Sequence, residues 1–180
     1  MATRNIVVEP YNEAWKSDFE AIEKELAAVL GDLALSIEHV GSTSVPGLSA
    51  KAIIDIDVVI EDRSKIPAVV EALATIGYIH DGDKGIPGRE AFDYEGKEHL
   101  RNHHLYVCAQ DADELKRHLS FRDYLRSHPE AVAEYSRIKL EGAKLYPHDI
   151  DSYIEHKAPF IQGIYKELGL PLPSGNNGDK

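Results

Sequence analysis

Cysteine and long apolar runs are what this sequence has least of. Its 180 residues include a single cysteine, Cys108, so no disulfide forms within the chain, which agrees with a reducing compartment. No apolar run approaches the roughly 20 residues of a membrane span, and the N-terminus lacks the basic start and apolar stretch of a signal peptide. We therefore expect a cytoplasmic protein without membrane association, in which Cys108 is structural.

Basic residues are also scarce. The chain has 20 lysines and arginines against 31 aspartates and glutamates, which gives a formal net charge of -11 at pH 7. Proteins that bind nucleic-acid backbones normally present a surface rich in lysine and arginine, so this balance argues against general nucleic-acid binding. A small anionic ligand held by a few local cations is compatible with it. The 43% of apolar residues is enough for the core of one ordinary domain.

The pattern of apolar residues predicts an α/β protein. Apolar residues recur at helical steps between residues 11 and 30, and residues 53–60 form the clearest strand of the chain. Further strands are expected at 6–9, 33–40, 78–80, 91–94 and 103–108, the last two as a hairpin, and further helices at 64–76, 111–127, 129–145 and 149–168.

Polar residues and prolines predict where helices begin and bend. Ser64 is expected to cap the second helix, Asp111 or Asp113 the third, and Asp149 the last. Pro159 is expected to kink or divide that last helix. We expect an α/β core in residues 1–110, a helical part packed on it in residues 111–170, and a flexible tail in residues 171–180.

The most informative stretch runs from His39 to Ile60 and reads HVGSTSVPGLSAKAIIDIDVVI. Because side chains alternate along a strand, Asp55 and Asp57 share one face while the neighbouring Ile54 and Ile56 point to the other. Two carboxylates on a core strand are costly unless a positive charge neutralises them, and a divalent cation is the usual candidate. This pattern indicates a site that handles metal or phosphate.

The loop before that strand offers phosphate ligands. Residues 41–47 expose backbone N–H groups next to glycine and carry the hydroxyls of Ser42, Thr43 and Ser44. Such a loop wraps a phosphate without net charge. Read alone, the loop is better explained as a tight turn that uses glycine and proline for its geometry. The GK[ST] ending of a Walker loop is absent.

Loop and strand together resemble the nucleotidyltransferase signature, in which a glycine-serine loop holds the triphosphate and a following D-x-D holds magnesium. More specifically, residues 5–168 resemble the GrpB family through HVGSTSVPGLSAK, IDID, RNHHLYV, FRDYLR, the Tyr135–Lys139 step and the segment 153–161. That family is regarded as nucleotidyltransferase-like and also occurs fused to dephospho-CoA kinase. The resemblance implies a small mixed, mostly antiparallel sheet, phosphate binding by Gly41, Ser42, Thr43 and Ser44, and a Mg²⁺ ion held by Asp55 and Asp57.

A departure from the superfamily concerns the third carboxylate, which usually comes from a later strand. The matching strand here, HHLYV, has no acid, and His104 stands at that position with Asn102 and Tyr106 on the same face. The family usually shows a second histidine at the position of Tyr106. His104 is either a metal ligand or base, or a partly buried histidine bonded within the sheet, and the residues leave both open. His103 is expected to point away.

Three cations lie on or beside the apolar stripes of the late helices: Arg122, Lys139 and Lys157. Any one of them alone is expected to extend to the surface or pair with an acid. In an acidic protein, three of them together can line the cleft between helices and sheet and receive a polyphosphate, with Lys51 joining them.

The leading hypothesis is therefore Mg²⁺-dependent nucleotidyl transfer from a nucleoside triphosphate to an unidentified acceptor. In it Asp55, Asp57 and His104 carry the chemistry. The alternative is a non-catalytic module that binds a nucleotide or a partner on the same scaffold. A third option is a zinc or other transition-metal site formed by His104 and the two aspartates.

Overall fold

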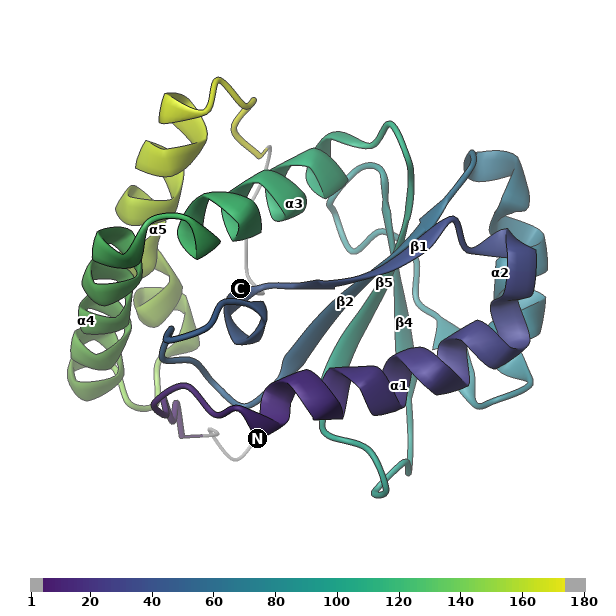
Figure 1. The fold of residues 1–180 in the computed structure, drawn as a ribbon, viewed down its shortest axis with the longest axis horizontal. Helices are drawn as coiled ribbons and strands as arrows, with labels where there is room; N and C mark the ends of the chain where they lie inside the picture. The colour runs from purple at the N-terminus through teal and green to yellow at the C-terminus, as the bar shows by residue number, and fades with distance from the viewer. Residues whose placement is uncertain (1–4, 174–180) are drawn as a thin grey trace.

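The computed structural model describes residues 5–173 and contains a five-stranded sheet with helices on both faces (Figure 1). The strands are β1 (Ser36–Val40), β2 (Ile54–Ile60), β3 (Tyr78–His80), β4 (Arg89–Tyr94) and β5 (His103–Ala109). The helices are α1 (Ala14–Leu30), α2 (Ile66–Ala74), α3 (Asp113–Arg126), α4 (Pro129–Leu145) and α5 (Ile150–Glu167), and short 3-10 turns are η1 (Gly31–Leu33), η2 (Ser42–Ser44) and η3 (Arg63–Lys65).

The sheet has the strand order β1-β2-β5-β4-β3. Three neighbouring pairs are antiparallel, and only β2 and β5 run parallel among the described strands. The expected mixed, mostly antiparallel sheet is therefore confirmed, as is the hairpin of β4 and β5. The parallel pairing puts Asp55 directly beside His104 and Asp57 beside Tyr106, so the polar residues of both strands lie on one face.

The main hydrophobic core lies between the other face of the sheet and helices α1 and α2. Trp15, Ile22 and Leu26 on α1 meet the alternate residues of β2, including Ile54 and Ile56, and all are buried. The alternation predicted for this strand is confirmed, because its apolar residues enter this core and its two acids face away from it. The core thus fixes the direction in which both carboxylates point.

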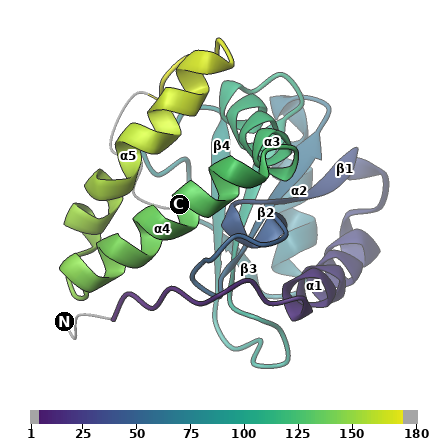
Figure 2. The ribbon, with the colours of Figure 1, turned by 60° about the vertical axis from the view of Figure 1, so that its left-hand side comes forward.

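Helices α3, α4 and α5 lie against the acid-bearing side, and Figure 2 shows α4 and α5 across the sheet from α1. A second apolar cluster joins them to the loop before β2, where Val45 and Leu48 pack with Leu125, Val132 and Tyr135. This packing fixes the position of the loop relative to the late helices. The division into parts at residue 110 stays a prediction.

Several local expectations were wrong. Residues 6–9 form no strand but a single bridge from Glu9 to Ala50, because Pro10 follows at once. Asp62, rather than Ser64, accepts the capping hydrogen bond of the turn before α2. Helix α3 begins without a side-chain cap, whereas Asp149 caps α5 as expected.

Pro159 lies inside α5 without dividing it, since the helix runs unbroken from residue 150 to residue 167. Within residues 5–173, the structure has no helix that is long and apolar enough to cross a membrane. The expected flexible tail at 171–180 lies outside the described residues from position 174 on.

Candidate phosphate-binding site

The loop between β1 and β2 is held against β2 by a close approach at Gly41. This glycine has φ +71° and ψ -174°, a backbone conformation that almost only glycine adopts. A Cβ atom at this position would lie 2.2 Å from Oδ2 of Asp55. Glycine is therefore required at position 41 for two reasons: the positive φ of the turn and the close contact with Asp55.

The hydroxyls of the loop have different partners. Thr43 Oγ1 lies 2.9 Å from Nε2 of His39, and Ser44 Oγ donates to the Gly41 carbonyl at 2.5 Å. The Lys139 amine donates to Ser42 Oγ. Burial lowers the pKa of His39 to about 4, so its ring is neutral at pH 7. His39 on β1 and Lys139 on α4 therefore both hold this loop in place.

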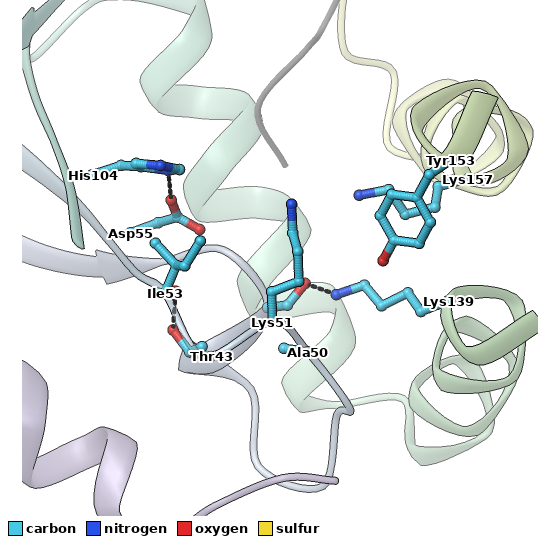
Figure 3. Close-up of a pocket in the computed structure, with 10 residues that line it drawn as sticks. Thr43, Ala50, Lys51, Ile53, Asp55, His104, Lys139, Tyr153 and Lys157 are labelled. Atoms are coloured by element: carbon cyan, nitrogen blue, oxygen red, sulfur yellow. Dashed lines mark hydrogen bonds and ion pairs between the residues drawn. The ribbon is translucent and has the colours of Figure 1, made fainter. Parts of the chain in front are cut away.

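A pocket opens beside this loop, and Figure 3 shows its lining side chains. They come from the loop, from β2 and β5, and from α4 and α5, so residues far apart in the sequence meet here. The lining consists of Ser42, Thr43, Ala50, Lys51, Ile53, Asp55, His104, Lys139, Tyr153 and Lys157.

Asp55 and His104 form a hydrogen-bonded pair at one side of the pocket. Nδ1 of His104 lies 3.0 Å from Oδ1 of Asp55, and the two residues are direct neighbours on β2 and β5 (Figure 3). His103 points the other way, with its Nε2 2.7 Å from the Tyr78 hydroxyl, as expected. A carboxylate paired with a histidine in this way can orient the ring for proton transfer.

Three lysines face Asp55 across the pocket (Figure 3). Lys139 is 3% exposed and Lys157 is 1% exposed, and their amines lie 4.5 Å and 4.6 Å from the ring centres of Tyr135 and Tyr153. Burial, followed by repulsion from Lys51, lowers the pKa of Lys157 to about 7. Burial and repulsion from Lys157 and Lys51 likewise hold the pKa of Lys139 well below its usual range.

Asp57 does not line this pocket. It is 0% exposed, and its Oδ2 is hydrogen-bonded to Nδ1 of His118 on α3. Nε2 of the same ring lies 2.8 Å from Glu114, whose carboxylate also accepts from Arg117 at 2.7 Å. The second acid of the D-x-D pattern is therefore part of a buried polar cluster beneath α3.

The charges in this cluster stabilise one another. Burial alone would lower the pKa of His118, but the charge of Asp57 and the hydrogen bonds to Asp57 and Glu114 raise it to about 10. Burial alone would raise the pKa of Glu114, but its bonds to His118 and Arg117 lower it to about 2. The histidine is thus a cation at neutral pH.

Arg122 also lies outside the pocket lining. Its guanidinium donates to Glu38 at 2.9 Å and to the His39 carbonyl at 3.1 Å, so it holds the end of β1. Arg126, one turn further along α3, donates to the Ser44 carbonyl at 3.0 Å and 2.9 Å. The structure uses both arginines to fix the loop.

The magnesium that the superfamily implies does not fit these carboxylates as a shared site. Oδ1 of Asp57 has no hydrogen-bond partner within residues 5–173, which suits a cation, but the residue is closed to solvent and Oδ2 is bonded to a cation already. Mg²⁺ usually keeps several waters and needs accessible oxygens. In the described part of the chain, no group of three or more His, Cys, Asp or Glu side chains can hold a metal, so the zinc site expected from His104 and the aspartates is not formed.

This pocket brings together most of the residues singled out in the sequence, but its lining does not include Gly41, Ser44, Asp57 or Arg122. Their roles in function stay predictions. His118 and Glu114 were missed, although their spacing of four residues on a helix is a signal that they share a face. Tyr153 was part of the family resemblance, but its position under two lysines was not foreseen.

The fold of this chain is nucleotidyltransferase-like. Cid1 poly(U) polymerase, solved bound to MgATP, shares the fold with a TM-score of 0.54 at 12% identity, over 76% of this chain and 44% of that one. The chain belongs to the GrpB family, whose model, described as GrpB protein, matches residues 5–167. The resemblance found in the sequence is thereby confirmed.

Relatives cover the chain almost throughout. The crystal structure of GrpB from Enterococcus faecalis is 36% identical, with a TM-score of 0.79 over 89% of this chain and 96% of that one. The glutamate-rich protein GrpB of Alkalihalophilus pseudofirmus is 33% identical over 91% of this chain and 95% of its own length. YqkA of Bacillus subtilis is 35% identical over 88% of this chain, which spans only 46% of that relative. A dephospho-CoA kinase of Mycolicibacterium paratuberculosis is 27% identical over 87% of this chain and 44% of the kinase.

Gly41→Ala is expected to destabilise the protein more than Gly31→Ala. Both positions have positive φ, but a Cβ at Gly31 meets nothing within 4 Å, whereas one at Gly41 must displace Asp55. The shared backbone cost is about 1–3 kcal/mol, and the clash adds to it only at Gly41. Urea unfolding of both variants measures the difference. Equal losses would show that the contact with Asp55 is not tight.

Lys157→Met is expected to flatten the rise of stability with pH. Above about pH 7 the folded protein releases the Lys157 proton that the unfolded chain keeps, so the free energy of unfolding of the wild type increases until the unfolded amine also titrates. Removing the amine lowers this slope by on the order of 1 kcal/mol per pH unit. Urea unfolding between about pH 7 and about pH 9 measures it, with the exposed Lys144→Met as control. An unchanged slope would contradict the buried, deprotonating amine.

Proposed function

We propose that this protein binds a nucleotide through its phosphates in the pocket between the loop and helices α4 and α5. The observation that carries the proposal is the pair of almost fully buried lysines, Lys139 and Lys157, whose amines face the same space as Lys51. Asp55 is the one carboxylate among the described lining residues. Amines therefore outnumber carboxylates in this lining, in a protein with a formal charge of -11.

Burying an amine costs free energy, and grouping three amines costs more, because each disfavours the charge of the others. An anionic ligand reverses both effects, since it attracts protons back to the lysines and pairs with the charged forms. Phosphate oxygens also suit the hydroxyls of Ser42 and Thr43, which line the same pocket. The free energy that it costs to bury these amines without a ligand is thus offset when an anion binds.

The nucleotide part of the proposal has a separate support. The scaffold is nucleotidyltransferase-like, and Cid1, which shares it, was solved with MgATP and with MgGTP. The low identity restricts that likeness to the fold, so base and sugar recognition by this chain belongs to the proposal. The small pocket and the acidic surface favour a single nucleotide over a nucleic-acid strand as the ligand. A cytoplasmic location stays a prediction.

Lys139→Met is expected to weaken nucleotide binding by about 10- to 100-fold, which is the loss of one charge-assisted hydrogen bond. The free energy of unfolding should stay equal or rise, because methionine fills a similar volume without a buried charge. Isothermal titration with ATP, GTP, CTP and UTP, and with inorganic tripolyphosphate, measures affinity and shows whether the base contributes.

Lys144→Met is the matched control, since Lys144 lies on the same helix but is exposed. It should bind as the wild type does. Equal affinity of the Lys139→Met and Lys144→Met variants, or no binding of any of these anions to the wild type, would contradict the proposal.

Metal-dependent nucleotidyl transfer is the second candidate. It is favoured by the Asp55–His104 pair, which lies directly beside the phosphate loop, but not by the buried position of Asp57. If transfer occurs, radiolabelled nucleoside triphosphate is consumed with Mg²⁺ present, and Asp55→Asn abolishes the consumption while leaving the fold intact. Binding without consumption would favour the non-catalytic module instead.

A further inference from the structure

The buried cluster beneath α3 lies where the nucleotidyltransferase pattern predicts a metal. We propose that His118 is a built-in counterion of Asp57 that excludes divalent metal from this carboxylate. A consequence, which rests on the proposed function, is that the pocket binds its phosphate ligand without requiring a metal ion.

The charge of His118 follows from its contacts. Nδ1 of the ring is hydrogen-bonded to Asp57, and Nε2 lies 2.8 Å from Oε1 of Glu114. A neutral imidazole carries a proton on only one nitrogen, whereas carboxylates only accept. Both contacts are hydrogen bonds only when the ring is an imidazolium. A positive charge therefore lies at bonding distance from Asp57 before any ligand binds.

The cluster is also balanced without an added cation. Asp57 and Glu114 supply two negative charges, and His118 and Arg117 supply two positive ones; Arg117 donates to Glu114 through Nε at 3.0 Å and through a terminal nitrogen at 2.7 Å. A divalent ion placed at Asp57 would leave an excess of two positive charges in a buried site. Such an excess is strongly unfavourable unless His118 gives up its proton or moves away.

Access to Asp57 is closed as well. The residue is 0% exposed, and α3 covers it, held on this side by a small apolar cluster of Val59, Cys108 and Leu115. A hydrated ion reaches Asp57 only if α3 separates from the sheet. The helix thus restricts the route by which an ion enters, whereas the charge of His118 disfavours the bound ion itself.

The pocket on the other side of Asp55 supplies positive charge of its own. Lys51, Lys139 and Lys157 line it together with Asp55. The amines are placed to neutralise the phosphates and the imidazolium of His118 neutralises Asp57, which is a role that a metal ion has in other phosphate sites.

Removing His118 should convert the cluster into a metal site. In His118→Gln the carboxylates of Asp57 and Glu114 lose their shared cation, and Oδ1 of Asp57 has no hydrogen-bond partner within residues 5–173. Electron paramagnetic resonance of Mn²⁺ added to the protein alone reports binding without any nucleotide. The wild type should show no site that depends on Asp57, His118→Gln should gain one, and Asp57→Asn combined with His118→Gln should lose it again.

The exposed His99→Gln, whose ring lies 2.8 Å from Glu25, is the control and should behave as the wild type. The proposal is overturned if the wild type binds Mn²⁺ and Asp57→Asn abolishes that binding, or if a folded His118→Gln gains no site. Should His118→Gln unfold in the absence of metal, its thermal unfolding is followed with Mn²⁺, which is expected to restore a folded transition; no restoration contradicts the proposal.

Titration of ATP into the wild type, once with excess EDTA and once with excess Mg²⁺, tests the ligand form. We expect ATP to bind in EDTA at least as tightly as in Mg²⁺, where a difference of up to about twofold counts as equal. Binding that requires Mg²⁺ would overturn the inference. Absence of binding in both conditions would contradict the proposed function instead, and the Mn²⁺ measurement would still decide the role of His118.

Discussion

The arrangement of this protein depends on two carboxylates two residues apart on one central strand, each bonded to a different histidine. Asp55 pairs with His104 inside the sheet, whereas Asp57 pairs with His118 from a helix that crosses over it. Strand alternation puts both acids on the same face, away from the main core. The different partners then separate them, so one acid lies in a pocket and the other beneath α3.

The pairing at Asp57 also fixes what lies further along α3. His118, Arg122 and Arg126 follow one another at intervals of four residues, so they share one face of the helix. The first contacts β2, the second contacts Glu38 and the carbonyl of His39 on β1, and the third contacts the loop at Ser44. A single polar stripe therefore sets the relative positions of sheet, loop and helix. Arg122, predicted from the sequence as a phosphate ligand, bonds to the end of β1 in the structure, and its part in phosphate binding stays a prediction.

The parts of this fold that sequence predicts well are those that depend on local periodicity. The apolar residues of α1 and the alternation of β2 predict which side chains meet in the core, and the glycine-serine loop followed by the acids indicates the pocket. Contacts across long sequence separations were not predictable in the same way. The partner of Asp57 lies 61 residues away, on a helix whose inward face is charged rather than apolar, so no hydrophobic pattern marks it. The bridge from Glu9, which replaces the strand expected at residues 6–9, likewise depends on a residue far away in the sequence, Ala50.

The three lysines of the pocket come from widely separated segments: Lys51 precedes β2, Lys139 lies on α4 and Lys157 on α5. Lys51 comes before the two acids in the chain, whereas Lys139 and Lys157 come well after them. A phosphate ligand that contacts all three amines, as proposed above, therefore depends on the packing of α5 beside α4, and any change that separates these two helices would lower its affinity.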